Sequence, residues 1–579
     1  FESTVIAALE FNQKLDFLTE GLSLKALASF KNWSSSTNAR AGKWNRFALT
    51  GYEEDGNGGY TYTTSRIGDE FQTDLTATNS TSGDRRFYLE GMLNYSRTFD
   101  EHDINAMFIY SQDEYVNNVP GNGNFIGSLP KRKQGVAARA SYAYAGKYMA
   151  EVNVGYNGSE NFAKGHRFGL FPSVAVGYNI SEENFFKPLK NTISKLKLRA
   201  SWGLVGNDQI SDARFLYMSQ INLSGKGFTT GVNQNVTYSG PVYQRYANED
   251  ITWEVGEKIN FGVDLQLFRS LDLTFDIFRE NRRDIFQEKQ TVPTYMGTAS
   301  TKVYGNLAAM RNQGFELAAS YNKQFNKDWF VSFKGTFTYA HNEITKYDES
   351  PKYPWQSKVG ASANMNAIYI ADGLFIDSED IAHHQQQLGS TIVPGDIKYV
   401  NVSRDWYGYD DNLTDTDDWV WAKYPSVPEI VYGFGPSIKW KNLDFSFFFQ
   451  GVAKTSFMVK DMHPFGDNSL RNVLSWIADE RWSPDNQNTN ATYPRLSRKT
   501  NANNTKLSTY WQRNGAFLKL KNAEIGYTHK NMRIYISGSN LLTFAPFKLW
   551  DPEQGGGSGL SYPTQRVFNI GFQMTINNK

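Results

Sequence analysis

Aromatic residues in one long polar segment are the side chains of this chain best suited to contact a ligand. Their flat apolar faces and polar tips suit sugar rings and peptide side chains alike. Aromatic residues also pack loops together, and membrane barrels place them in girdles at both interfaces, so these alternatives stay open. We predict that the segment contacts a substrate. The candidate residues are Trp406, Tyr407, Tyr409, Trp419 and Trp421.

The same segment carries a run of carboxylates. Carboxylate oxygens suit Ca²⁺, but the run lacks the glycine at the sixth position and the terminal glutamate of a helix-loop-helix calcium site. We interpret the run as solvated loop acid, with calcium binding as the alternative. The run consists of Asp410, Asp411, Asp415, Asp417 and Asp418.

The adjacent pair His383-His384 is the other candidate for a metal. Two exposed imidazoles without a third ligand are typical of solvated side chains. The sequence also has no Cys, which removes Cys-ligated metals and disulfide frameworks from consideration. We therefore predict no metal site.

No motif of enzyme chemistry is present. The sequence has no Gly-x-Ser-x-Gly elbow, no Gly-x-x-x-x-Gly-Lys phosphate loop and no His-Glu-x-x-His zinc helix. The glycine runs Gly121-Asn122-Gly123 and Gly555-Gly556-Gly557 need only mark tight turns. The 60 basic and 59 acidic residues balance, which argues against a nucleic-acid partner. We expect no catalytic residue and no cofactor.

The elements that position these residues are long strands, and the stretch Ile251–Phe286 is their clearest example. Apolar residues occupy every second position, first on Ile259–Leu267 and again from Leu271 to Ile277, with a tight turn at Phe268-Arg269-Ser270 between them. Such alternation gives each strand one apolar and one polar face. The strands are roughly twice the usual five or six residues of globular proteins. This length favours a transmembrane barrel, with apolar side chains facing lipid and polar ones lining a wet lumen; an edge hairpin of a large secreted β-protein is the alternative.

Helical membrane spans are excluded, because no apolar run approaches the roughly 20 residues that a spanning helix needs. The mean hydropathy of −0.53 would suit a soluble protein. A barrel gives the same value, since its polar lumen-facing half offsets its lipid-facing half.

Further strand pairs follow the same pattern along the chain. We count about 17 strands, or about 19 if short pieces inside Ala41–Ser82 also span; otherwise that stretch is an elaborated loop. The other predicted strands are Ser3–Leu18, Leu22–Ser35, Phe87–Tyr95, Ile104–Tyr110, Lys133–Tyr144, Lys147–Asn157, Arg167–Asn179, Lys195–Asn207, Phe315–Phe325, Trp329–Ile344, Val431–Trp440, Leu443–Phe449, Ala516–Tyr527, Met532–Asn540 and Arg566–Ile576.

Connections between strands alternate in length. Short ones such as Lys441-Asn442 separate the members of a pair, and long ones such as Lys346–Glu429 and Gly451–Asn514 separate the pairs. Bacterial outer-membrane barrels have short periplasmic turns and long extracellular loops. This alternation of short and long connections predicts a multi-pass outer-membrane protein with its C-terminus in the periplasm.

An odd strand count implies that the sheet lacks strands. Unpaired backbone groups cost several kcal/mol each in lipid, so we expect the missing strands to come from residues before Phe1 or from another chain. Barrels of about 22 strands hold a plug in the lumen. No plug-like segment is visible here. We interpret residues 1–579 as most of a 22-stranded antiparallel transmembrane β-barrel, an all-β domain that is incomplete without upstream strands and a plug.

Several segments resemble the barrel of SusC-like TonB-dependent transporters, which import glycans and peptides across the outer membranes of Bacteroidetes. They occur in the family's order across most of the chain. The matching segments are Arg167–Ser173, Asn179–Glu183, Leu196–Gly203, Ala371–Phe375, Pro394–Tyr399, Asp551-Pro552-Glu553 and Tyr562-Pro563.

This resemblance implies import of an oligosaccharide or oligopeptide, coupled to TonB through an upstream plug. It also implies a SusD-like lipoprotein that closes over the extracellular loops, outer-membrane lipid around the wall, and a possible dimer of transporter–lid pairs. The alternative from another class is a passive porin or the structural barrel of a secretion or adhesion assembly. A plug with a TonB-binding box would distinguish import from passive flow.

Overall fold

The computed structural model describes residues 1–68, 74–120, 125–293, 295, 301–387, 391–404, 408, 410–460, 473–497 and 501–576. Within them, one large sheet contains 17 strands, and every neighbouring pair with an assigned register in it is antiparallel. The strands of this sheet are β1 (Glu2–Lys14), β2 (Leu22–Ala41), β5 (Thr76–Phe99), β6 (His102–Asn117), β7 (Lys131–Tyr144), β8 (Tyr148–Ser159), β9 (Phe168–Asn179), β10 (Ile193–Asn207), β13 (Glu254–Leu267), β14 (Leu271–Glu288), β15 (Tyr304–Gln324), β16 (Trp329–Lys346), β23 (Ile430–Trp440), β24 (Leu443–Ala453), β27 (Phe517–His529), β28 (Met532–Phe544) and β29 (Val567–Met574).

Smaller elements occupy the connections. The short strands form two-stranded sheets, all but one of them antiparallel. They are β3 (Arg46–Glu54) with β4 (Tyr60–Ile67), β11 (Gln220–Thr230) with β12 (Val236–Arg245), β17 (Ala367–Tyr369) with β22 (Trp419–Trp421), β18 (Ala371–Leu374) with β20 (Ile397–Tyr399), β19 (Gln386–Gln387) with β21 (Leu413–Thr414), and β25 (Ser456–Met458) with β26 (Gln512–Asn514). The helices are α1 (Phe125–Ser128), α2 (Ser378–His383), α3 (Ser475–Asp479) and the 3₁₀ turns η1 (Ile180–Glu182), η2 (Asn184–Leu189), η4 (Pro354–Gln356) and η5 (Pro552–Gln554). None of the helices among the described residues is both long and apolar enough to cross a bilayer.

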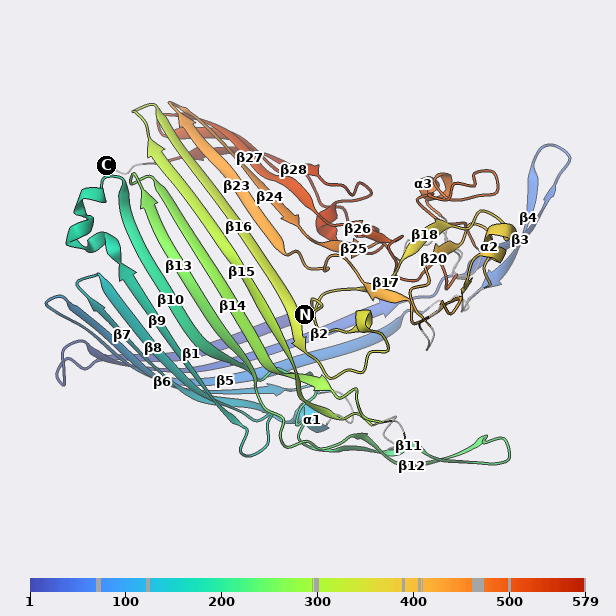
Figure 1. The fold of residues 1–579 in the computed structure, drawn as a ribbon, viewed down its shortest axis with the longest axis horizontal. Helices are drawn as coiled ribbons and strands as arrows, with labels where there is room; N and C mark the ends of the chain where they lie inside the picture. Colours follow the sequence, from blue (N-terminus) through green and yellow to red (C-terminus); the bar gives the residue numbers. More distant parts are fainter. Residues whose placement is uncertain are drawn as a thin grey trace. The chain divides into compact units, whose positions relative to one another are not determined.

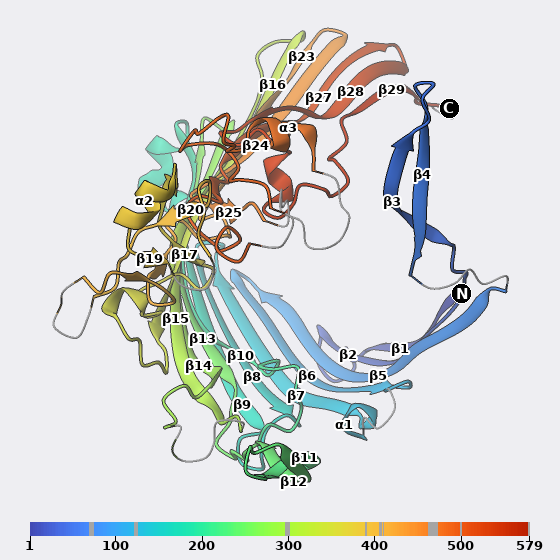
Figure 2. The ribbon, with the colours of Figure 1, turned by 90° about the vertical axis from the view of Figure 1, so that its right-hand side faces the viewer.

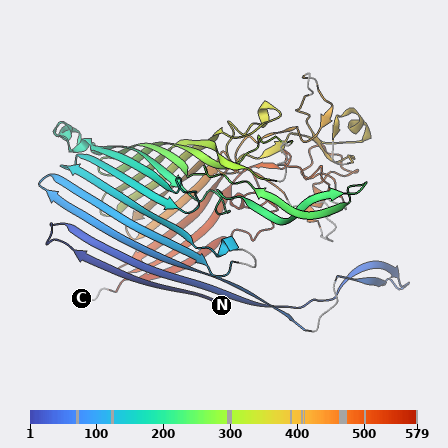
Figure 3. The ribbon, with the colours of Figure 1, turned by 90° about the horizontal axis from the view of Figure 1, so that it is seen from below.

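The chain divides into two compact units. The first contains residues 1–98, 104–140 and 153–170. In it, β2 lies between β1 and β5, so that Phe30 is opposite both Ala7 and Phe87. These strands run side by side in Figure 3. The pieces predicted inside Ala41–Ser82 form the separate β3–β4 ribbon, so the large sheet has the lower of the two predicted strand counts (Figure 2).

The second unit contains residues 99–103, 141–152 and 171–579. Its strands pair in the order β9, β10, β13, β14, β15, β16, β23, β24, β27, β28 and β29. Figure 1 shows the short turns of these hairpins at one end of the strands and the long connections at the other. The predicted alternation of connection length is therefore present in this unit.

The β13–β14 hairpin has the faces that its alternation predicts. Ile259 and Ile277 are 46% and 51% exposed, so this apolar row is not buried against a second sheet. On the opposite, polar face, Arg199 Nε lies 3.0 Å from Asp264 Oδ2 and its Nη2 lies 3.1 Å from Asp276 Oδ2. An apolar outer row and a charge-paired inner row are what a wall between lipid and water requires.

Several strands extend further than predicted. β15 begins at Tyr304, eleven residues before the predicted Phe315, and β5 and β2 continue into the stretch interpreted as a loop. The predicted alternation marks only the part of a strand with lipid on one side. Where a strand projects beyond the bilayer both faces meet water, so its periodicity disappears while its ladder of backbone hydrogen bonds continues.

Candidate functional site

Three long connections of the second unit fold together beyond the ends of their strands (Figures 1 and 2). They are residues 347–429, 454–516 and 545–566, and each contributes side chains to one buried apolar cluster. We call this cluster the loop core. Its buried members are Leu374, Ile397, Tyr399, Phe457, Val459, Ile477, Trp482, Ala491, Tyr493, Trp511 and Phe547.

The segments Ala371–Phe375 and Pro394–Tyr399, noted for their resemblance to the SusC-like family, supply the centre of this core. Leu374 in β18 pairs with Ile397 in β20, and both side chains are buried. Gly395 has a φ of +85°, and a Cβ there would lie 2.3 Å from the Trp482 ring. Both the turn and the close approach therefore require glycine.

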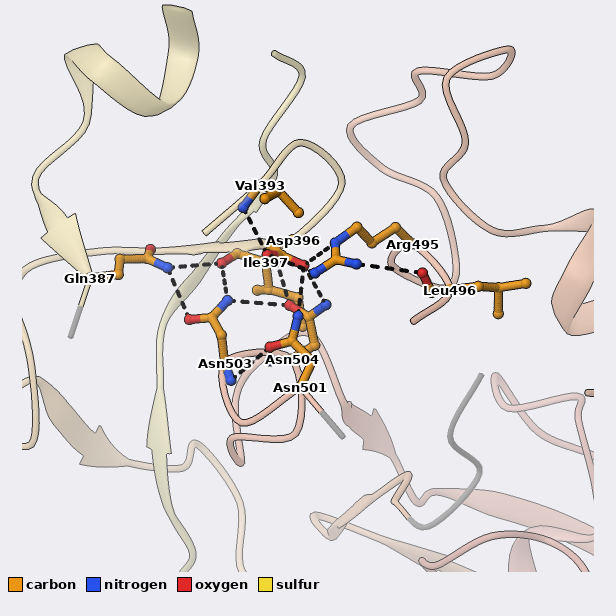
Figure 4. Close-up of polar contacts among 9 residues, drawn as sticks. All are labelled: Gln387, Val393, Asp396, Ile397, Arg495, Leu496, Asn501, Asn503 and Asn504. Carbon is orange, nitrogen blue, oxygen red and sulfur yellow. Dashed lines mark hydrogen bonds and ion pairs between the residues drawn. The ribbon is translucent and has the colours of Figure 1, made fainter. Parts of the chain in front are cut away.

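Asp396 is the polar centre of the loop core and has no solvent exposure (Figure 4). Arg495 Nε donates to Asp396 Oδ1 over 2.7 Å, and the side-chain amides of Asn501 and Asn504 each donate to the same oxygen over 2.9 Å. The backbone N–H of Val393 donates to the other carboxylate oxygen over 3.0 Å. A buried carboxylate is stable only when its oxygens are satisfied in this way, so the network fixes two long connections to each other.

A second set of amides continues from this network. Gln387 Nε2 donates to Asn503 Oδ1 over 3.0 Å, and the Tyr399 hydroxyl donates to the Asn503 carbonyl over 2.7 Å. Burial raises the pKa of Tyr399, so its hydroxyl keeps its proton at neutral pH. Lys506 Nζ lies 4.8 Å from the centre of the Tyr369 ring, where burial lowers its pKa. These hydrogen bonds join residues 387–399 to residues 501–504 inside the loop core.

The interpretation of the acidic run as solvated loop acid is wrong for Asp418, whereas Asp410 is exposed as predicted. Asp418 is fully buried and accepts from the backbone N–H groups of Val402, Ser403 and Asp415 over 2.7–2.8 Å. Asp411 accepts from Asn401 Nδ2 over 2.8 Å; burial acts to raise the pKa of Asp411, but hydrogen bonds lower it overall. These carboxylates hold the loop backbone in place.

Metal-ligating side chains do not converge in the described part of the chain: no group of three or more His, Asp or Glu residues there is arranged to hold an ion. His383 lies at the end of α2, where its Nδ1 is 2.8 Å from the Glu379 carbonyl. His384 packs its ring edge-on against Phe375, with 5.1 Å between ring centres.

Trp419 and Trp421 are the two predicted substrate contacts that the structure describes. Both lie on β22. Their rings meet edge to face, with centres 5.1 Å apart. Trp421 Nε1 donates to the Ser357 carbonyl over 2.7 Å, which gives this indole a structural role. Both side chains are partly exposed. Trp406, Tyr407 and Tyr409 lie outside the described residues.

The connection between β28 and β29, together with the end of β28, lines an open cavity of about 540 Å³. Trp550 is part of its lining; the Trp550 ring meets Phe547 edge to face at 4.6 Å, and its Nε1 donates to the Gly555 carbonyl over 3.0 Å. We call this cavity the terminal-loop cavity. Its lining residues are Asn540, Thr543, Phe547, Lys548, Leu549, Trp550, Asp551, Pro552, Gln554, Gly559, Ser561, Pro563, Thr564 and Arg566.

A buried lysine fastens this connection to the wall. Lys519 on β27 has no solvent exposure, and its Nζ lies 2.5 Å from Asp551 Oδ2 and 2.7 Å from Glu553 Oε2. Lys521 Nζ adds a contact of 2.6 Å to Glu553 Oε1. Burial acts to raise the pKa of both carboxyl groups, but the lysines lower it overall. The Asp551-Pro552-Glu553 motif therefore holds this connection against β27. We call the ion pairs of Lys519 with Asp551 and Glu553 the Lys519 clamp.

Asp396 and Lys519 were not singled out from the sequence. Asp396 lies in a segment that resembles the SusC-like family, and for Lys519 only its partners Asp551 and Glu553 do. Their partners lie far along the chain: Arg495 is 99 residues from Asp396.

Comparison with known proteins gives consistent matches. Residues 6–541 match the family model described as TonB dependent receptor-like, beta-barrel. TonB-dependent receptor P3 of Formosa agariphila is 25% identical over 84% of this chain and 52% of its own length. TonB-dependent receptor SusC of Bacteroides thetaiotaomicron is 25% identical over 75% of this chain and 43% of its own. The chain thus spans about half the length of these curated relatives.

Among solved structures, the RagAB peptide transporter aligns with a TM-score of 0.70 and 19% identity, over 99% of this chain and 62% of that one. The RagAB peptide importer in its 'open-open' state gives the same values. At this identity the likeness shows the fold.

Proposed function

Because this chain belongs to the TonB dependent receptor-like β-barrel family, we propose that it forms the wall and the extracellular mouth of an energy-coupled importer. The family is one of outer-membrane transporters and not of enzymes, which agrees with the absence of catalytic motifs in the sequence. The observation that carries the proposal is the loop core. Substrate capture needs loops held in a fixed arrangement, and the loop core supplies one.

The remaining parts of the machine are proposed with it. A plug engaged by TonB would fill the lumen, and further strands would complete a wall of about 22 strands. The curated relatives are about twice as long as the matched region, which leaves room for both. The short turns and the C-terminus would then lie in the periplasm, and the loop core outside the cell.

For the partner, we propose a SusD-like lipoprotein that closes over the loop core. The names SusC and RagAB among the similar proteins support this proposal. We also propose a dimer of transporter–lid pairs. The substrate would be an oligosaccharide or an oligopeptide.

For the substrate contacts, we propose Trp406, Tyr407, Tyr409, Trp419 and Trp421. Trp419 and Trp421 are supported by their partial exposure. Trp406→Ala should weaken binding of substrate to the intact complex by about tenfold, the lower end of what one stacked aromatic side chain contributes at a binding site.

Uptake by cells tests the proposal. A strain that depends on the intact protein is given fluorescent oligosaccharides and oligopeptides, with TonB present or deleted. Accumulation of one class only when TonB is present supports import. Equal accumulation without TonB contradicts it and favours the passive porin.

A further inference from the structure

We propose that the terminal-loop cavity binds a carboxylate group of the imported oligomer, an inference that rests on the proposed function and narrows its substrate. The cavity has room for one or two residues of an oligomer, since ligand sites in proteins begin at about 300 Å³. It lies between the ends of β28 and β29, beside the loop core.

The charge of its lining favours an anion. Lys548 and Arg566 are both exposed and both line the cavity, and neither side chain makes a hydrogen bond or ion pair with another described residue. The single acidic residue of the lining, Asp551, is already bound by Lys519 at 2.5 Å. The cavity therefore presents two free cations and no free carboxylate.

The kind of anion follows from the shapes of these groups. The planar fork of a guanidinium matches the two oxygens of a carboxylate, and an ammonium adds a point charge. Acidic sugars and peptides both carry carboxylates, so the two substrate classes share this chemistry.

The rest of the lining suits the body of such a ligand. Trp550 is held in place by Phe547 and by the bond from its Nε1 to Gly555, so its ring is a preformed apolar surface. The neighbouring Gly559 has a φ of +66°, and a Cβ there would lie 2.4 Å from the Trp550 ring. Thr543, Ser561 and Thr564 add hydroxyl groups. An aromatic surface with hydroxyl groups around it can contact a sugar ring or a peptide side chain beside the bound carboxylate.

Binding to the intact purified complex tests this inference. The probes are a galacturonic acid trimer with maltotriose as its neutral analogue, and a tetrapeptide with a free or an amidated C-terminus. The variants are Lys548→Gln, Arg566→Gln and the double variant. Lys164→Gln is the matched control, since Lys164 is an exposed lysine of the connection between β8 and β9, outside the cavity lining. Circular dichroism verifies that each variant is folded.

We expect at least one carboxylate probe to bind more tightly than its neutral analogue. Each cavity variant should raise the Kd of that probe by roughly 10- to 100-fold, as expected for loss of a hydrogen bond to a charged group. The Kd of the neutral analogue and the binding of the Lys164→Gln variant should not change. Added salt should weaken carboxylate binding to the natural protein and have little effect on the double variant.

Which probe responds distinguishes an acidic glycan from a peptide as the source of the carboxylate. The inference is overturned if neither carboxylate probe binds, if neutral and acidic probes bind alike, or if the cavity variants bind like Lys164→Gln. None of these results would contradict the proposal of TonB-dependent uptake, because the uptake assay tests that proposal separately.

Discussion

In the β13–β14 hairpin the apolar row is exposed and the charged row is paired on the other face, whereas in the loop core Ile397 and Tyr399 are completely buried around a carboxylate. The wall therefore exposes its apolar side chains, the reverse of what a soluble protein does. The loop core buries its apolar side chains, as a soluble protein does. The difference reflects the solvent on each side. Hydrocarbon outside the wall accepts apolar side chains, while the loops meet water on all sides and must build a core of their own.

Asp396→Ala should have the largest effect and should act on the loops alone. Removing one partner of a buried ion pair costs about 3–5 kcal/mol, because Arg495 is left without its carboxylate. Limited proteolysis should cut residues 347–429 and 454–516 at a higher rate, while the heat-modifiable mobility of the folded barrel on gels stays unchanged. Asp485→Asn, at an exposed loop position, is the control. Loss of the folded barrel together with the loops would contradict the distinction between the two regions.

Phe261→Lys tests whether the apolar face of β13 lies against lipid. A lysine facing hydrocarbon near the bilayer midplane costs about 2–4 kcal/mol. Asn260→Lys, one position along and on the polar face, should cost much less. Denaturant unfolding in lipid vesicles measures both. Equal costs at the two positions would show that the Phe261 side of β13 does not face lipid.

The Lys519 clamp joins the two regions and should depend on pH. Because the folded pKa values of Asp551 and Glu553 lie below their unfolded values of about 4, the clamp contributes fully above about pH 5 and is lost as pH falls through the lowered pKa values. Hydrogen exchange in residues 545–566 should therefore show less protection in acid.

Lys519→Met should remove this pH dependence and destabilise the same residues by about 1.5–3 kcal/mol at pH 7, the usual value of hydrogen bonds to charged groups. Lys548→Met, at an exposed lysine of the same connection, is the control. An unchanged pH dependence in Lys519→Met would assign the titration to other groups.

Trp421→Phe should have the smallest effect. It removes one hydrogen bond to the Ser357 carbonyl and keeps an aromatic ring, which costs about 0.5–1.5 kcal/mol. Thermal unfolding of the loops measures it, with Trp419→Phe as the control, since no indole hydrogen bond from Trp419 is found within the described residues. If Trp419→Phe destabilises the loops more than Trp421→Phe does, the structural role assigned to the Trp421 hydrogen bond is wrong.

The hairpins could be predicted from the sequence, because the alternation that produces them lies within one short stretch of the chain. Neighbouring strands joined by short turns, such as β13 with β14, follow from alternation within one stretch. Strand ends beyond the bilayer were missed, because alternation disappears where both faces meet water. The loop core was missed for another reason: its members come from three connections, and nothing in a single connection indicates the other two.

The sequence by itself determined which face of each spanning strand is apolar and which connections are long, because side-chain alternation and chain length between strands are local properties. Only the tertiary structure decided that Asp396 meets Arg495, that Lys519 meets Asp551 and Glu553, and that Asp418 is buried. Those contacts depend on which loops come together once the wall has formed. Their charges are tolerated only because every buried carboxylate there finds a donor.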